Sequence, residues 1–201
     1  MEQTWEEEIS RLRPDTFAIN PLILGRWSPR SFLDKPVPES DLLAILEAAR
    51  WAPSCFNAQP WRFLVARREP ALARLRACLT ESNQTWANRA PVLLAVLSVP
   101  NFALENRPNR WNAFDAGTAW GYLALEAHRR SLVAHGMGGF SQKAVRAAFN
   151  VPEDWGVHAL VAVGYRAPAD QLSPEQQEQE HPSLRKPLAE IWFDGELKIN
   201  G

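Results

Sequence analysis

Residues 26–30, Arg26-Trp27-Ser28-Pro29-Arg30, could hold an anion, because two arginines four positions apart flank a serine. Guanidinium groups bind phosphate oxygens through charge-assisted hydrogen bonds, and a serine hydroxyl can add one more donor. The proline ring stiffens the backbone of the segment. A solvated basic loop without a ligand is the alternative interpretation.

A second segment, Pro53-Ser54-Cys55-Phe56-Asn57-Ala58-Gln59-Pro60, follows a predicted helix and is framed by two prolines. Asn57 and Gln59 each offer a hydrogen-bond donor and an acceptor, so together they could contact the mixed polar edge of a heterocycle. The same amides would also suit a turn in which they bond only to nearby backbone.

A third segment, Gly136-Met137-Gly138-Gly139-Phe140, combines three glycines with two large apolar residues. Because glycine has no side chain, its backbone N–H can lie close to a flat ligand. A plain turn between a strand and a helix would use the same glycines.

Other kinds of active site lack a signature in this sequence. It contains neither a Gly-x-Gly-x-x-Gly run after a strand nor a Gly-Lys-Ser/Thr phosphate loop, and no Gly-x-Ser-x-Gly nucleophile elbow. The histidines are scattered, at His128, His135, His158 and His181, and the two cysteines are too few for a structural zinc site. Hydrolase and metalloenzyme functions are therefore disfavoured, and we predict no metal.

The composition is that of one ordinary globular domain, which we expect to span residues 1–201. A formal net charge of −1 argues against a nucleic-acid partner. The first residues are acidic, unlike a signal peptide, and the apolar run at 90–99 is too short to cross a membrane. We therefore expect a cytoplasmic protein with no membrane partner. The nine tryptophans suit either a core or flat contact surfaces.

Apolar periodicity and stop signals predict the elements that position these segments. We expect helices over 5–12, 40–52, 70–79, 114–130, 141–149 and 187–190, and strands over 61–67, 91–99, 132–135 and 157–165. Residues 101–112 are predicted to form a mobile loop and residues 173–181 a solvated linker. The stretch with Pro21, Gly25 and Pro29 that follows Pro14 is also predicted to be a loop. Gly117 and Gly121, on adjacent turns of one helix, would allow close approach of another element. The terminal triplet Ile191-Trp192-Phe193 could pack on a second copy of the chain.

In this order and spacing, the segments resemble the nitroreductase family of FMN-dependent oxidoreductases. The resemblance covers residues 25–191. It depends on the three segments above, on Ala48-Ala49-Arg50-Trp51-Ala52 before the second, and on Val163-Gly164-Tyr165 and Arg185-Lys186-Pro187-Leu188. Two departures stand out: Pro29 replaces a commonly aliphatic residue, and Cys55 replaces a small one, where it could be redox-active or an inert packed thiol.

The resemblance implies an α+β fold with a central antiparallel sheet flanked by helices. It also implies an intertwined homodimer that binds FMN at the subunit interface and exchanges C-terminal arms. Arg26 and Ser28 would hold the FMN phosphate, with Arg185 and Lys186 closing on it, and Arg30 would lie beside the ring. The remaining cofactor contacts would come from Trp27, Pro53, Ser54, Cys55, Asn57, Gln59, Met137, Gly138 and Gly139, with Ser54, Asn57 and Gln59 belonging to the other subunit.

The implied activity is electron transfer from NADH or NADPH through FMN to a nitroaromatic, quinone or related acceptor. Donor and acceptor would use one open face in turn, giving ping-pong kinetics, and no side chain would act as a catalytic acid or base. Two alternatives stay open: a specialised enzyme of the same fold, such as a dehalogenase, an oxidase or a flavin-fragmenting enzyme, and an FMN-binding protein without turnover. Candidates for preferring NADPH are Arg67, Arg107 and Arg110.

Overall fold

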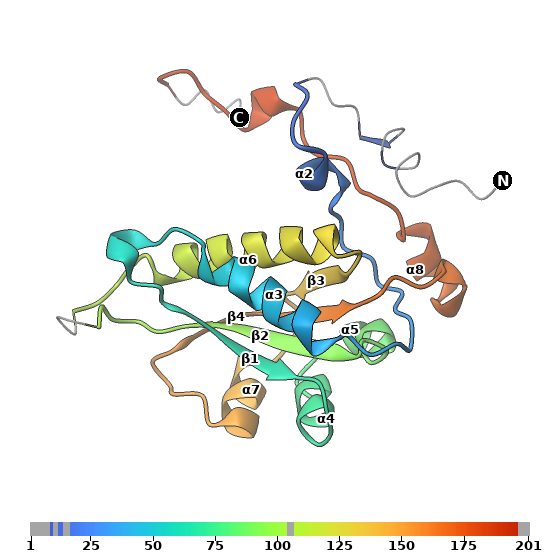
Figure 1. Cartoon of the computed structure of the whole chain (residues 1–201), viewed down its shortest axis with the longest axis horizontal. Coiled ribbons are helices and arrows are strands. Elements are labelled where there is room, and N and C mark those ends of the chain that lie inside the picture. The colour runs from blue at the N-terminus through green and yellow to red at the C-terminus, as the bar shows by residue number, and fades with distance from the viewer. Residues whose placement is uncertain (1–8, 10–11, 14–16, 104–106, 197–201) are drawn as a thin grey trace.

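The computed structural model describes residues 9, 12–13, 17–103 and 107–196. Its centre is a four-stranded sheet in the order β1-β2-β4-β3, with every neighbouring pair antiparallel (Figure 1). The strands are β1 (Trp61–Ala66), β2 (Val92–Ser98), β3 (Val133–Met137) and β4 (Gly156–Gly164). All four lie where the sequence predicts a strand, which confirms the expected central antiparallel sheet.

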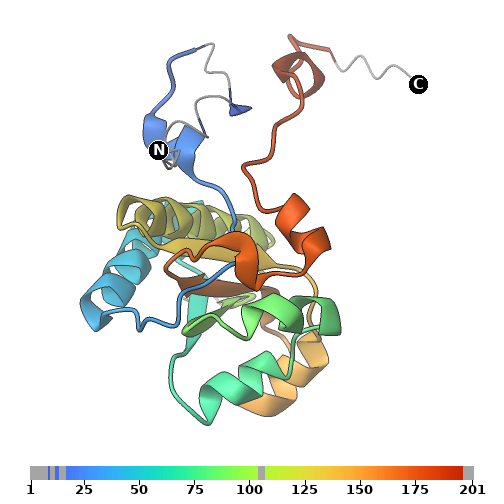
Figure 2. The same ribbon diagram turned by 90° about the vertical axis from the view of Figure 1, so that its right-hand side faces the viewer.

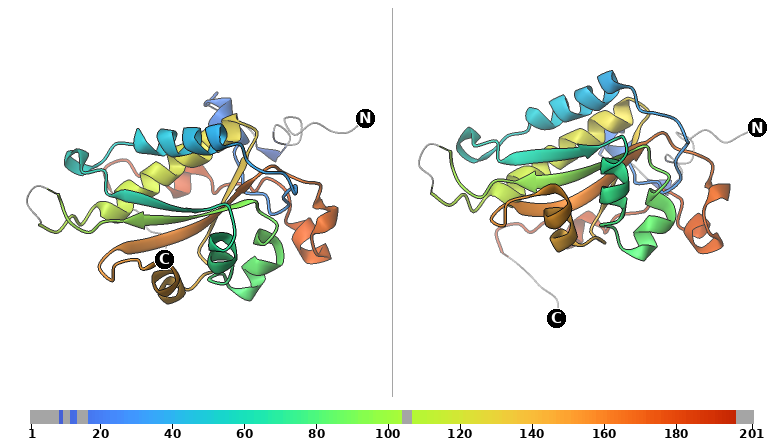
Figure 3. Two further views of the ribbon diagram at one scale, coloured as in Figure 1. Left: turned by 60° about the horizontal axis from the view of Figure 1, so that its bottom comes forward. Right: turned by 90° about the horizontal axis from the view of Figure 1, so that it is seen from below.

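Helices cover both faces of the sheet, as Figure 3 shows. On one face lie α3 (Glu39–Arg50) and α6 (Asn112–Arg129), and on the other lie α4 (Ala71–Arg76), α5 (Glu81–Ala87) and α7 (Gln142–Phe149). Each face has its own apolar core. Because β2 contributes to both cores, all seven of its residues are buried.

Local signals explain where these helices begin and end. In α7, the Ser141 hydroxyl accepts a hydrogen bond from the Ala144 N–H at 3.1 Å, and Asn150 ends the helix in the left-handed conformation. Helix α3 begins after Pro38 and buries a stripe of Leu42, Ile45 and Ala49. These helices confirm the predictions over 40–52 and 141–149.

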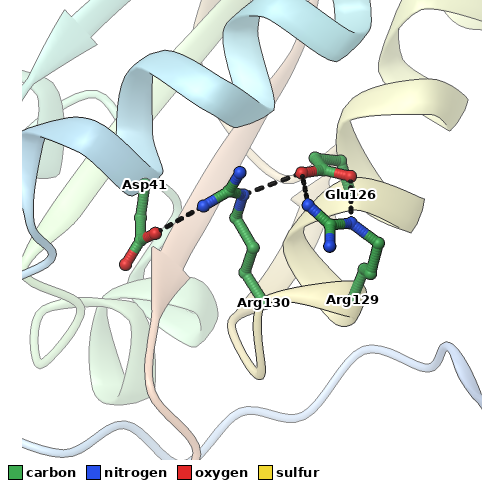
Figure 4. A network of polar contacts seen from close by, with 4 residues as sticks. All are labelled: Asp41, Glu126, Arg129 and Arg130. Carbon is green, nitrogen blue, oxygen red and sulfur yellow. Dashed lines mark hydrogen bonds and ion pairs between the residues drawn. The ribbon is translucent and has the colours of Figure 1, made fainter.

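An ion-pair network joins the end of α6 to the start of α3 (Figure 4). Arg130 contacts Asp41 at 2.8 Å and Glu126 at 2.7 Å, and Arg129 contacts Glu126 at 2.7 Å. Hydrogen bonds from Arg129 and Arg130 hold the pKa of Glu126 below its usual range. The network therefore links the end of α6 to α3 on the same face of the sheet.

Several expectations are corrected or fall outside the described residues. The predicted helix at 5–12 lies mostly outside them, as do residues 104–106 of the predicted loop. A short helix, α2 (Pro21–Gly25), stands in a predicted loop because the Asn20 side chain caps it. Helix α5 was not predicted. Gly117 and Gly121 face open space, so no other element approaches them within the described chain.

The predicted linker at 173–181 is also wrong, because α8 (Pro174–Glu178) lies within it. Ser173 and Gln176 form a reciprocal capping box, and Pro174 occupies the first turn. Beyond α8, the chain runs to a short 3-10 turn, η3 (Leu188–Glu190), and rises above α6 beside the segment that contains α2 (Figures 1 and 2). Among the described helices, none is long and apolar enough to cross a membrane.

Candidate functional site

A cavity of about 390 Å³ lies where the segment after α2 meets the segment after α8. Four arginines contribute to its wall, together with aromatic, hydroxyl, imidazole and amide groups. The lining residues are Arg13, Arg26, Trp27, Ser28, Arg30, His135, Gln179, His181, Ser183 and Arg185. The cavity thus brings together the first predicted segment and Arg185, which is 155 positions beyond Arg30 in the chain.

Residues 26–30 present their polar side chains to this cavity because the backbone is extended there. Arg26, which ends α2, has φ −68° and ψ 125°. Alternate side chains of an extended segment point in opposite directions, and accordingly Trp27 and Pro29 are buried while Arg26, Ser28 and Arg30 are half-buried. Arg26 also donates a hydrogen bond to the Ser28 hydroxyl at 3.2 Å.

Gly25 lets this extended segment begin against α6. A Cβ at this position would lie 2.7 Å from Nε2 of His128, a half-buried residue near the end of α6. A larger residue at this position would therefore require the His128 ring or the backbone at Gly25 to move.

The described residues that line the cavity include arginines but no carboxylate. Burial lowers the pKa of the Arg26 guanidinium, and the nearby charge of Arg185 lowers it further. Burial, then Arg185, then Arg26 lower the pKa of Arg13 in the same way. Among the described residues, no ion pair joins Arg13, Arg26 or Arg185 to a carboxylate. The cavity is thus suited to an anion, and a phosphate group fits its donor set.

Glu180 fixes the backbone on which this site is built. Its carboxylate is only 5% exposed. It accepts hydrogen bonds from the Arg30 N–H, at 2.9 Å to each oxygen, and from the Ser31 N–H at 3.0 Å. The Ser31 hydroxyl donates to the Pro168 carbonyl at 2.6 Å. Glu180 lies in the predicted solvated linker, so the sequence analysis missed it; only the Ser-Pro-x-Gln capping pattern could have indicated order there.

We expect Glu180→Ala to lower the free energy of unfolding by about 3 kcal/mol, because it leaves two backbone N–H groups without their charged acceptor. Urea unfolding of both proteins at one concentration would measure this difference. Glu178→Ala is the matched control: Glu178 is exposed in α8, so its removal should change stability by less than about 0.5 kcal/mol. Equal urea midpoints for Glu180→Ala and wild type would contradict the role given to Glu180.

His135 contributes a neutral ring to the cavity. Its Nδ1 lies 2.9 Å from the Pro29 carbonyl, and its ring lies 4.5 Å from that of Trp86. Burial lowers the pKa of His135 to about 4, although the bond to Pro29 opposes this shift. At neutral pH the imidazole is therefore uncharged and donates from Nδ1 to Pro29. His135 is not among the site residues predicted from the sequence.

The second predicted segment lies elsewhere on the same chain. Pro53, Ser54 and Cys55 line a separate cavity of about 320 Å³ with Trp111, Phe114, Asp115 and Thr118. The buried Asp115 carboxylate accepts a hydrogen bond from the Cys55 N–H at 3.2 Å. One chain therefore does not bring this segment to the arginine cavity.

Three residues of that turn adopt left-handed backbone conformations. Phe56, Asn57 and Gln59 have φ of 49°, 54° and 47°. The Gln59 N–H donates to the Ser54 hydroxyl at 3.0 Å, and the Gln59 amide donates to the Asn57 carbonyl at 3.1 Å. Non-glycine residues rarely hold this conformation without compensation, and the exposed Asn57 side chain stands on the strained turn.

The third segment begins directly after His135, in the last residues of β3. Met137 is buried and Gly138 is exposed, with open space where a Cβ would stand. Gly139 has a structural reason to be glycine: a Cβ there would lie 2.6 Å from the Asn83 amide nitrogen. Lys186 is exposed, pairs with Glu190 at 3.9 Å, and does not line the arginine cavity.

Comparisons with known proteins all point to the nitroreductase family. The model of the nitroreductase family matches residues 23–83 and 78–165. A Thermus thermophilus protein named NADH dehydrogenase is 33% identical over 201 residues, covering 84% of this chain and 91% of the relative. A crystal structure of an oxidoreductase containing FMN has a TM-score of 0.89 and 40% identity, covering 92% and 96% of the two chains. An FMN-dependent nitroreductase from Clostridium difficile has a TM-score of 0.61 and 25% identity, covering 71% and 84%.

Proposed function

The chain belongs to the nitroreductase family, and from that premise we propose that it binds FMN and transfers electrons from NADH or NADPH to a nitroaromatic, quinone or related acceptor. The arginine cavity carries this proposal, because it concentrates positive charge without a carboxylate partner among the described residues. The similar oxidoreductase structure is described as containing FMN, and the phosphate group of FMN is an anion that this cavity could bind. Bound FMN would supply the redox chemistry.

The chain's own residues would bind and orient the cofactor. Arg26, Ser28 and Arg185 would hold the phosphate, since they line the cavity together. Arg30 lines the same cavity and would place its charge toward the ring, where it would stabilise added negative charge. Lys186 would need to turn away from Glu190 to join the phosphate site.

We infer that the rest of the site comes from a second copy of the chain. Asn57 and Gln59, with Ser54 and its neighbours Pro53 and Cys55, stand on a turn that does not reach the arginine cavity of its own chain. In a homodimer, that turn would contact the ring bound to the partner, and Gly138 would offer an exposed backbone N–H. This arrangement also gives the strained Phe56–Gln59 turn a function.

The proposed kinetics are ping-pong, with the electron donor leaving before the acceptor enters the same face. Anaerobic mixing of the flavin-loaded protein with NADH or NADPH, followed at the flavin absorbance, measures the first half-reaction. Steady-state rates with a quinone or a nitroaromatic measure the second, and parallel double-reciprocal plots are expected. Bleaching by neither nucleotide would contradict an oxidoreductase function and favour a flavin-binding protein, whereas bleaching without turnover would contradict the proposed acceptors.

A further inference from the structure

Arg13 braces the arginine cavity from a part of the sequence that carried no predicted site residue. Its side chain is 8% exposed. Nη1 donates to the carbonyls of Leu24 at 2.6 Å and Arg26 at 2.9 Å, and Nε donates to the Ser183 carbonyl at 3.1 Å. One guanidinium therefore connects the end of α2 with the segment after α8, which form the two sides of the cavity.

The remaining nitrogen of this guanidinium is unsatisfied. Nη2 is buried and makes no hydrogen bond among the described residues. Leaving such a charged donor unpaired is costly, because it has lost its water without gaining a partner. Arg13 lines the cavity beside Arg26 and Arg185, so an anion there could lie near all three guanidinium groups.

The charges around Arg13 also favour an anion in this cavity. Burial lowers the pKa of Arg13, and the like charges of Arg185 and then Arg26, which line the same cavity, lower it further. The carboxylate of Glu180, which does not line the cavity, accepts hydrogen bonds from the backbone N–H groups of Arg30 and Ser31. A bound dianion would attract all three guanidinium groups and so offset the repulsion between them.

We propose that Arg13 is a further binding residue for the cofactor phosphate, acting with Arg26 and Arg185. This inference rests on the proposed function, since it needs FMN to be the ligand of the cavity. A phosphate bound by Arg13, Arg26 and Arg185 would also connect the segment after α2 with the segment after α8, which the Arg13 side chain already joins through hydrogen bonds.

The test compares FMN with riboflavin, which has the same ring and ribityl chain but no phosphate. Flavin-free protein is titrated with each ligand, and quenching of flavin fluorescence measures the two dissociation constants. Arg13→Ala is expected to weaken FMN binding about tenfold or more while changing riboflavin binding less than about threefold, because only FMN carries the partner of this charge. Arg68→Ala, which removes an exposed arginine before α4, is the matched control and should change neither constant.

Arg13→Gln provides a second variant in case Arg13→Ala does not fold, because the glutamine amide can still donate to one carbonyl while the charge is gone. It should show the same selective loss of FMN. An equal loss of FMN and riboflavin affinity in the folded variant would assign Arg13 a purely structural role and overturn the proposal, as would unchanged FMN affinity. A failure of the proposed function would appear in the wild-type protein itself, which would then bind FMN no more tightly than riboflavin. A failure of the Arg13 proposal alone would appear only in the variants.

Discussion

Replacing Arg26 with alanine is expected to weaken FMN binding about ten- to a hundredfold while leaving the protein folded. A charge-assisted hydrogen bond to phosphate contributes about 1.5–3 kcal/mol, and each 1.4 kcal/mol corresponds to about a factor of ten in affinity. Arg26 is half-buried in the cavity wall, and no carboxylate pairs with it among the described residues. Its side chain donates one hydrogen bond within the described part of the chain, to the Ser28 hydroxyl. A titration of flavin-free protein with FMN measures the effect.

Fold stability provides the internal control for this variant. Burial and then the nearby charge of Arg185 lower the pKa of Arg26, so removing Arg26 relieves both the cost of its burial and this repulsion in the protein without ligand. Thermal unfolding of the flavin-free variant should therefore occur at or near the wild-type temperature, whereas added FMN should raise that temperature less than in wild type. Wild-type FMN affinity in Arg26→Ala would show that the phosphate does not bind in this cavity.

Deleting the chain from Ile191 onward is expected to reduce dimer stability and FMN occupancy together. Ile191, Trp192 and Phe193 are 62%, 56% and 40% exposed in the single chain, an unusual concentration of large apolar side chains on a surface. If a partner subunit buries them, losing each aromatic costs roughly 3 kcal/mol or more. The twofold symmetry of a dimer applies that loss to both copies.

Sedimentation across a dilution series, read at the flavin absorbance, measures both properties at once. For the truncated protein, higher concentration should restore dimer and flavin in parallel, since the Asn57 turn and the Arg26 cavity would belong to different subunits. Deleting only residues 197–201 is the matched control, because it keeps Trp192 and Phe193. If the truncated chain keeps its flavin as a monomer, or the wild-type protein sediments as a flavin-loaded monomer, the shared site is wrong.

Much of the fold could be predicted from the sequence because its signals are local. The uninterrupted apolar run of β2 is typical of a strand buried on both faces, and α7 is bounded by a capping serine and a left-handed asparagine. The central antiparallel sheet and its flanking helices also agree with what the resemblance implies. By contrast, α2 and α8 are five residues each, too short for apolar periodicity to reveal them.

The site could be predicted only in part, because its supporting contacts join distant residues. Arg26 and Ser28 were predicted as an anion site from their residue types and spacing, Arg185 was assigned through the family resemblance, and the cavity brings the three together. Glu180 and Arg13 were missed because their partners lie 150 and 170 positions away, at Arg30 and Ser183. No local pattern distinguishes a buried glutamate in a Gln/Glu-rich stretch from its solvated neighbours. The role of the Pro53–Gln59 turn depends on a second chain and stays a prediction.

The central claim is that the arginine cavity holds the single phosphate of FMN, and the most direct test is to identify the chromophore of the purified protein. The protein is denatured, and the released flavin is identified by chromatography and mass, with its amount related to the number of chains. We predict FMN at about one molecule per chain, because the cavity gathers its cations around one anion site and the sequence lacks a glycine-rich pyrophosphate loop. Release of FAD, or failure to take up any flavin after reconstitution with FMN, would contradict the account.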